Sequence, residues 1–328
     1  MEYVIHILFS IITSYLFFKN FKIFAKKLGL IDNKNPNYNH KPTPTGSGII
    51  FTIIISFGSL IFYISNTNFI DSLPRNYLIF LISIFLLSII SFKDDIKTID
   101  PIFRLIFQII LVYLSLTMFA MNSIPIQSKI SFIFFTFVWI YIINISNFID
   151  GSDGFLAINF LFVAINTLLF KFITDTNIFS YYVVILIIPS VLIFFLFNKP
   201  PAKIYMGDAG SIALGYTTGF IFIEIVFTQN FGIAISIISY MLCDCTVSLI
   251  KKMRKGYMPW KGLYDYYFLI PVLKSKKNHK KVLYCIFIFH ILNTTIILIQ
   301  LYTGYELFFI FSFILSFITM GIFKNSIR

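Results

Sequence analysis

Paired acidic side chains next to basic residues are the first feature of this chain that could do chemistry. Asp94 and Asp95 are adjacent, Lys93 and Lys97 flank them, and Arg104 follows within a few turns. Two neighbouring carboxylates do not ionise together readily unless positive groups compensate them. These residues therefore predict a site that takes up a proton or contacts a metal-bound phosphate.

A second polar group follows at helical spacing. Asn144, Asn147 and Asp150 recur every third residue, and a Gly-Ser-Asp-Gly turn containing Asp153 comes directly after them. This spacing lays three polar side chains along one side of an otherwise apolar helix end, which favours a ligand site. The alternative is a capping turn, but caps explain only one or two of these residues.

A third acidic residue lies in a glycine-flanked turn. Asp208 stands between Gly207 and Ala209, shortly after Lys203 and directly before an apolar stretch. Free N–H groups and the helix dipole at such a helix start favour phosphate oxygens. Mg²⁺ held by Asp208 would bridge to a diphosphate. A plain N-cap role for Asp208 is the alternative.

Two further loops are basic. The loop before residue 48 is rich in Pro, Gly and Asn and presents Lys34, His40 and Lys41. The stretch 251–281 carries ten basic residues and His279. Basic loops commonly serve only to fix membrane orientation, and that is the alternative for the second loop.

Composition indicates where these residues must be placed. Of 328 residues, 58% are hydrophobic and only 12% are charged, which excludes a water-soluble globule. We predict an all-α polytopic membrane protein with about eleven transmembrane helices, because a span needs about 17–25 apolar residues. The expected spans are 3–18, 48–65, 77–92, 101–119, 130–145, 155–172, 179–197, 212–227, 231–250, 282–302 and 307–323.

The basic residues then orient the chain. Of its 26 Lys and Arg residues, 23 fall on one of the two alternating sets of loops. Cytoplasmic loops carry this excess, so we expect the N-terminus outside and the C-terminus in the cytoplasm. The net charge of +12 thus indicates contact with membrane lipids rather than nucleic acid. Residues 1–328 are expected to form one polytopic domain that includes the basic cytoplasmic loop 251–281.

Taken together, the motifs resemble those of the polyprenyl-phosphate N-acetylhexosamine-1-phosphate transferases, glycosyltransferase family 4. The resemblance runs from about residue 28 to 255 and covers the Asp94-Asp95 pair, the 144–154 motif, the Pro-Pro-Ala-Lys-Ile-Tyr-Met-Gly-Asp-Ala-Gly-Ser motif at 200–211 and the early Pro-Thr-Pro loop. It implies transfer of a HexNAc-1-phosphate from a UDP-sugar to undecaprenyl phosphate, giving polyprenyl-diphospho-HexNAc and UMP. Such a reaction would initiate a lipid-linked cell-envelope glycan.

The resemblance also implies roles. Asp208 and Asn147 correspond to the family's metal ligands, with Mg²⁺ as the cofactor and Mn²⁺ as its substitute. Asp94 and Asp95 correspond to the catalytic pair, acting as base or nucleophile. Substrate contacts are expected from the remaining polar residues: Asn144, Asp150, Asp153, Lys97, Arg104, Lys203, His40 and His279. The expected partners are UDP-N-acetylhexosamine, polyprenyl phosphate and a second copy of the chain in a homodimer. The expected location is the bacterial cytoplasmic (inner) membrane, with the active site facing the cytoplasm.

One departure bears on the donor. Family members usually carry a His motif in the last inner loop, whereas residues 261–271 contain no histidine. The sequence therefore places the chain nearest the O-antigen type, which uses UDP-GlcNAc and serves lipopolysaccharide biosynthesis. The alternative is phospho-N-acetylmuramoyl-pentapeptide transferase of cell wall biogenesis. A transporter or lipid flippase is the alternative of another class, but such proteins place ionisable groups near the bilayer midplane rather than at one rim.

Overall fold

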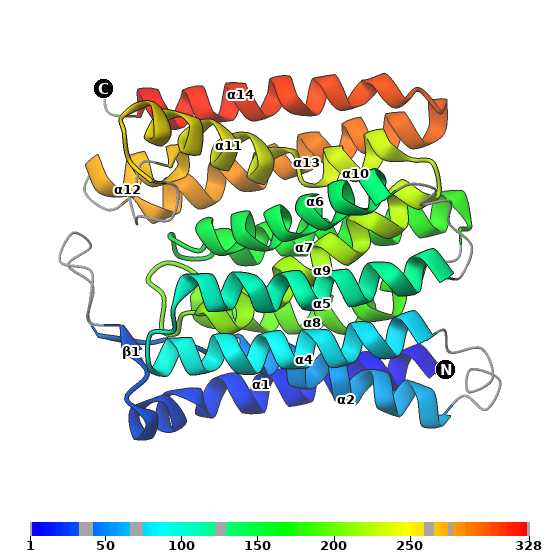
Figure 1. The fold of residues 1–328 in the computed structure, drawn as a ribbon. Coiled ribbons are helices and arrows are strands. Elements are labelled where there is room, and N and C mark those ends of the chain that lie inside the picture. The colour runs from blue at the N-terminus through cyan, green and yellow to red at the C-terminus, as the bar shows by residue number, and fades with distance from the viewer. Residues whose placement is uncertain are drawn as a thin grey trace.

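Long helices lying side by side make up the protein (Figure 1). The computed structural model describes residues 2–32, 42–65, 75–121, 129–176, 178–258, 266–274 and 278–326. The N-terminus and the C-terminus lie at opposite ends of the bundle. Within the described residues, the strands are the two-residue β1 (Ile31–Asp32) and β2 (Thr43–Pro44), which pair antiparallel with Ile31 opposite Pro44.

The helices follow the apolar stretches of the sequence. Their bounds are α1 Glu2–Leu28, α2 Ile49–Ser65, α4 Arg75–Ile96, α5 Pro101–Met121, α6 Lys129–Phe148, α7 Phe155–Thr174, α8 Ser180–Asn198, α9 Asp208–Phe227, α10 Phe231–Ile237, α11 Ser239–Arg254, α12 Ile270–Lys274, α13 His279–Thr303 and α14 Phe309–Asn325. Two short 3-10 helices, η2 (Tyr267–Leu269) and η3 (Glu306–Phe308), precede α12 and α14.

The structure confirms an all-α polytopic membrane protein. Among the described residues, eight helices are long and apolar enough to cross a membrane, or nine if the bent pair α10–α11 is one span. Helices α2 and α5 are apolar but contribute shorter stretches, 49–61 and 101–117. Each of the eleven expected spans therefore falls on a helix or on the bent pair.

Two expected boundaries are wrong. The stretch 231–250 is not one straight span, because the chain bends by 70° between α10 and α11. Helix α1 continues to Leu28, so residues 19–28, expected in a loop, are helical. The lysines in this part of α1 have long apolar stems, which allow their charges to point outward from the helix.

Helix α9 is the core of the bundle. Seventeen of its twenty residues are buried, and it packs most extensively with α6 and α4. Small residues allow this close approach: a Cβ on Gly219 would lie 2.0 Å from the indole of Trp139. Because α9 is enclosed on most sides, whatever stands at its first turn is held on a rigid support.

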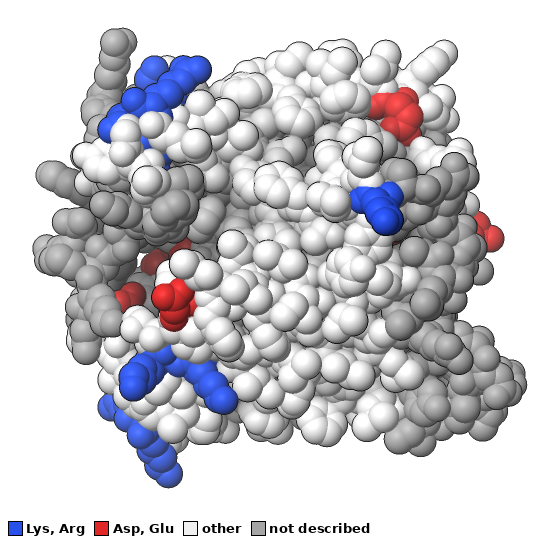
Figure 2. All heavy atoms as spheres, viewed as in Figure 1, with Lys and Arg blue, Asp and Glu red and all other residues white. Residues whose placement is uncertain are grey.

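Most of the Lys and Arg side chains in view, and a hollow with acidic groups, lie at one end, while other acidic side chains and a basic group lie toward the opposite end. Figure 2 shows acidic side chains in a hollow at the left, with Lys and Arg groups above and below it. This is also the end at which the C-terminus lies in Figure 1. The acids thus lie at a rim of the bundle rather than at its middle, as the sequence predicts.

Candidate active site

The first turn of α9 is the centre of the site. Gly207, just before Asp208, has a positive φ of 75°, and a Cβ there would lie 2.7 Å from Oδ2 of Asp95 and 2.6 Å from the Gly46 nitrogen. Only glycine fits such a backbone conformation at such a contact. The glycine-flanked turn of the sequence motif therefore brings the α9 start against two other segments.

One of these segments is the early loop, residues 43–48. Tyr205 N–H donates to Pro44 O at 2.7 Å, and Gly48 N–H donates to Met206 O at 2.8 Å. Gly48 also meets Gly210 directly, because a Cβ on Gly48 would lie 2.1 Å from the Gly210 Cα. The described part of this loop is thus joined to the Lys203–Ser211 motif by backbone contacts.

The other segment is the end of α4, which carries the acidic pair. Asp95 accepts the N–H groups of Asp208 at 2.9 Å and Ala209 at 3.1 Å, so it caps α9 from a different helix. The sequence suggested a catalytic role for Asp95 but did not show this cap. A carboxylate at a helix start compensates its free N–H groups and its dipole.

Arg104, at the start of α5, joins Asp94 to Asp208. Its Nη1 contacts Oδ2 of Asp94 and lies 2.6 Å from Oδ2 of Asp208. The other oxygen of Asp94 accepts the Ile99 N–H at 2.5 Å. The Asp208 side chain is 32% exposed against 12% for Asp94, so Asp208 is the more accessible of the two acids.

Helix α6 adds the two asparagines. Asn147 donates through Nδ2 to Oδ1 of Asp208 at 2.9 Å and to the Ser211 hydroxyl at 3.0 Å, which leaves its Oδ1 for a ligand. Asn144 lies one turn deeper and donates to Gln108 of α5 at 3.0 Å. Gly207 is the N-cap of α9 and Asp208 is its first residue, and the side-chain bonds shown for Asp208 go to Arg104 and Asn147, so the N-cap alternative does not explain Asp208.

Asp150 approaches the same turn from the α6–α7 connection. Helix α6 ends at Phe148, so Asp150 lies beyond it and not on the helical face the spacing predicted. Burial, and then the carboxylates of Asp208, Asp95 and Asp153, raise the pKa of Asp150 to about 8, while a hydrogen bond from the Gly207 N–H opposes that rise. Loss of hydration and nearby like charges both favour the protonated form.

Asp153 and His279 hold the turn between α6 and α7 in place. Asp153 is 4% exposed and accepts the Ala202 N–H at 3.0 Å. His279, at the start of α13, is 5% exposed, and its Nδ1 lies 3.0 Å from the Ser152 hydroxyl and 3.2 Å from the Asp153 nitrogen, whose N–H it accepts. Both residues belong to the site, but the contacts shown support the loop.

Three expected residues are peripheral or undescribed. Lys97 and Lys203 are exposed near the ends of the motifs that carry the acids. His40 lies outside the described residues. Sequence analysis overlooked Ser211, which Asn147 contacts, and Asn198, which accepts the Gly154 N–H and donates to Ile204 O, both at 2.9 Å. Their positions, inside and just before the 200–211 motif, were the available signal.

The donor set fits a magnesium ion that is completed by substrate. Among the described residues, no three His, Cys, Asp or Glu side chains converge tightly enough to hold a metal ion alone. Mg²⁺, however, commonly takes one or two carboxylates and fills its remaining positions with phosphate oxygens and water. Asp208 with Oδ1 of Asn147 matches that pattern.

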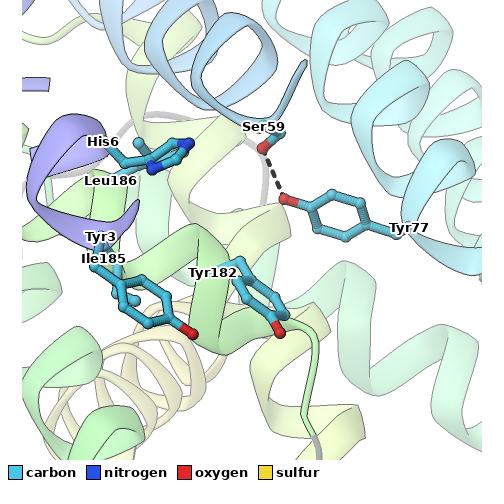
Figure 3. A pocket seen from close by; sticks show the side chains of 7 residues that line it. All are labelled: Tyr3, His6, Ser59, Tyr77, Tyr182, Ile185 and Leu186. Carbon is cyan, nitrogen blue, oxygen red and sulfur yellow. Dashed lines mark hydrogen bonds between the residues drawn. The ribbon is translucent and has the colours of Figure 1, made fainter. Parts of the chain in front are cut away.

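Two cavities are not lined by these acids. A groove of about 430 Å³ runs between α1, α2 and the end of α4, lined by Leu16, Phe17, Asn20, Phe21, Phe24, Ile49, Ile50, Ile53 and Phe92. A small pocket of about 10 Å³ lies among Tyr3, His6, Ser59, Tyr77, Tyr182, Ile185 and Leu186, where Ser59 and Tyr77 share a 2.6 Å hydrogen bond (Figure 3). The latter has room for about one water molecule.

Comparison with known proteins agrees with this geometry. Residues 77–226 match the family model of glycosyl transferase family 4. This stretch of the chain is therefore similar to that family. The matched range contains the acidic pair, Arg104, Asn147, Asp150 and Asp208, which are the residues that meet at the start of α9.

Several curated relatives are named phospho-N-acetylmuramoyl-pentapeptide-transferase. That of Petrotoga mobilis is 32% identical over 201 residues, 56% of this chain and 61% of the relative. That of Streptococcus uberis is 32% identical over 53% of this chain and 56% of the relative, and that of Lactobacillus gasseri is 31% identical over 57% and 63%. The chain thus spans about three fifths of the length of these relatives.

The relatives bear on two expectations. Together with the apolar helices, they identify a multi-pass bacterial membrane protein. Their name is the one the sequence analysis gave as its alternative, and it supports that alternative better than the O-antigen type.

Proposed function

We propose that this protein transfers a phospho-amino sugar from a UDP-linked donor to a polyprenyl phosphate. The observation that carries the proposal is the meeting of Asp94, Arg104, Asn147 and Asp208 at the first turn of α9. An oxygen of the acceptor phosphate would bond to the donor's sugar-bearing phosphorus, and the bond from that phosphorus to the UMP oxygen would break. Phosphoryl transfer of this kind needs mainly positioning and positive charge.

The site residues divide into those that we assign to bind Mg²⁺ or phosphate and one that we assign to activate the acceptor. We assign Asp208 and Asn147 to Mg²⁺, which would neutralise charge on the donor diphosphate when bound. Arg104 already compensates two carboxylates and is placed to contact phosphate, and the exposed Lys97 and Lys203 are assigned the same role. We assign the acceptor's proton to Asp94, because Asp95 is fixed by two backbone N–H groups of α9, whereas Asp94 accepts one backbone N–H, that of Ile99, and its other oxygen contacts the Arg104 side chain.

We further propose that this end of the bundle faces the cytoplasm. Lys and Arg residues flank the hollow that holds the acids, and basic residues concentrate on cytoplasmic loops. UDP-sugars are water-soluble and highly charged, so a cytoplasmic opening would admit the donor while the polyprenyl chain stays in the bilayer.

For the donor, the names of the relatives favour UDP-N-acetylmuramoyl-pentapeptide. UDP-GlcNAc is the second candidate, and one observation favours it. The last inner loop has Tyr264 to Tyr267 in a stretch without histidine, where a His motif is expected for the muramoyl-peptide type. The acceptor is the same in both cases, so the two donors distinguish the candidates.

The experiment is UMP release by the purified protein with a short polyprenyl phosphate. Each donor is supplied separately, with Mg²⁺ or with EDTA. We expect release with UDP-N-acetylmuramoyl-pentapeptide that EDTA suppresses and that Asp208→Asn abolishes. Asp175→Asn is the matched control, because Asp175 is an exposed carboxylate at the end of α7, paired only with Lys171 at 3.1 Å among the contacts shown.

The outcomes separate the proposals. Release with UDP-GlcNAc alone would replace the donor and keep the reaction. Undiminished release by Asp208→Asn would reject the metal assignment. A protein that is folded and yet releases no UMP from either donor would reject the transferase proposal.

A further inference from the structure

A buried carboxylate on α11 holds a segment within the last inner loop. Asp244 is 0% exposed and accepts four hydrogen bonds. Two come from its own helix, from the Tyr240 hydroxyl at 2.9 Å and the Ser248 hydroxyl at 3.1 Å. The other two come from the backbone N–H groups of Tyr267 at 2.9 Å and Phe268 at 3.1 Å, in η2.

The segment that Asp244 holds packs on the turn that carries Asp150. The ring of Phe268 stacks on Phe155 with centroids 4.4 Å apart and planes at 13°. Tyr266 stacks on Phe148 at 6.2 Å. These contacts place η2 and the preceding Tyr266 against both ends of the 149–154 turn, since Phe148 ends α6 and Phe155 begins α7.

Gly151 makes the contact tight. A Cβ at Gly151 would lie 3.2 Å from Leu269, so the turn and η2 have no room between them. Asp150, the neighbour of Gly151, accepts the Gly207 N–H next to Asp208. Described contacts therefore run from Asp244 through η2 and the turn to Gly207, the N-cap of α9.

We propose that Asp244 is a positioning residue for donor binding, acting through η2 on the 149–154 turn. The inference rests on the proposed function, which assigns the donor diphosphate to Asp208, because Asp150 of this turn accepts the N–H of Gly207, the residue before Asp208. Asp244 itself lies behind η2 and is closed to solvent, so it does not contact the donor. Lys251, about two turns further along α11, also contacts η2, with its Nζ 4.1 Å from the ring centre of Tyr267.

The test is Asp244→Asn in the full-length protein. Asparagine keeps the shape but replaces one acceptor oxygen with an NH₂ group, which cannot accept an N–H. We expect KM for the UDP-linked donor to rise at least about tenfold, with kcat and the KM for polyprenyl phosphate within about twofold of wild type. Tyr240→Phe removes only one hydrogen bond, keeps both backbone contacts, and should raise the donor KM less.

Glu224→Gln is the matched control. Glu224 is a buried carboxylate that accepts two consecutive backbone N–H groups, those of Phe179 and Ser180, both at 2.8 Å. It lies near the end of α9 opposite Asp208. Its replacement should lower the unfolding temperature and leave both KM values unchanged, which separates a loss of stability from a loss of positioning.

A second readout does not depend on turnover. Amide hydrogen exchange should become faster in both 266–269 and 149–154 in Asp244→Asn, whereas Glu224→Gln should leave both segments unchanged. Faster exchange in 266–269 alone, or a donor KM equal to wild type in both Asp244→Asn and Tyr240→Phe, would overturn the proposal. If wild type releases no UMP from any donor, the proposed function fails, and the exchange data still decide whether Asp244 holds the turn.

Discussion

Arg104 Nη1 lies between two carboxylates from different helices, in contact with Asp94 Oδ2 and 2.6 Å from Asp208 Oδ2. The guanidinium thus occupies the position of a counter-ion between the acid at the end of α4 and the acid at the start of α9. Without a cation there, two like charges would face each other in partly buried surroundings, which is unfavourable. The relationship makes the stability of this end depend on positive charge.

Arg104→Gln should therefore destabilise the protein most in the absence of divalent metal. We expect the free energy of unfolding to fall by about 1–3 kcal/mol in EDTA, the usual effect of leaving a partly buried charged group without its partner. Mg²⁺ should recover part of it, so the rise in unfolding temperature on adding Mg²⁺ should exceed that of wild type. Lys171→Gln is the control, because its exposed partner Asp175 makes that pair weak. Equal unfolding temperatures for Arg104→Gln and wild type in EDTA would contradict the prediction.

Asp95→Asn and Asp94→Asn should differ in stability although both should lose most UMP release. Asp95 accepts two N–H groups at the first turn of α9, and an asparagine presents only one acceptor oxygen to them. We expect Asp95→Asn to lower the free energy of unfolding by about 1–2 kcal/mol, the size typical of a removed helix cap. Asp94→Asn loses a charge but keeps the cap on α9. Thermal unfolding of the two variants side by side checks this. An Asp95→Asn variant more stable than Asp94→Asn would argue against the capping role.

The sequence predicted the helices and the gathering of Asp94, Asn147 and Asp208 at one rim. Apolar length determines a span, and alternate loops of a polytopic chain must return to the same side, so both features follow from simple counting. Charge sorting also placed Lys97 and Lys203 at the end that carries the acids. None of this required knowledge of which side chains touch.

Contacts across helices could not be predicted in the same way. The cap of α9 by Asp95 and the bridge by Arg104 depend on how α4, α5 and α9 pack, which one sequence does not state. His279 was expected to contact substrate from the basic loop, yet it is buried and its Nδ1 contacts Ser152 and Asp153. The bend between α10 and α11 falls in a mostly apolar stretch without proline, where Ser236 and Ser239 lie on either side of Ile238.

Asp150 should give the protein a pH-dependent stability. Its pKa is about 8 in the folded chain, whereas an unfolded carboxyl titrates near about 3.9. The folded state therefore holds the proton more strongly. The stability that this proton contributes is fully present below about pH 4, declines as pH rises and is lost above about pH 8. Measured without metal or substrate, the unfolding temperature of wild type relative to Asp150→Asn should fall between about pH 5 and about pH 8 and then level off. A constant difference across this range would contradict the raised pKa.

Gly48→Ala tests whether the early loop positions the α9 start. A Cβ at residue 48 would lie 2.1 Å from the Cα of Gly210 and 2.5 Å from its nitrogen, and backbone atoms cannot move aside as a flexible side chain can. The loop must then separate from the turn that carries Asp208, so we expect at least about tenfold less UMP release together with a lower unfolding temperature. Gly321→Ala is the matched control, because that glycine lies within α14 and a Cβ there meets no atom within 4 Å. Alanine should be neutral or stabilise there by up to about 1 kcal/mol through its higher helix propensity. Should Gly48→Ala behave like Gly321→Ala in both measurements, the loop would not position the α9 start.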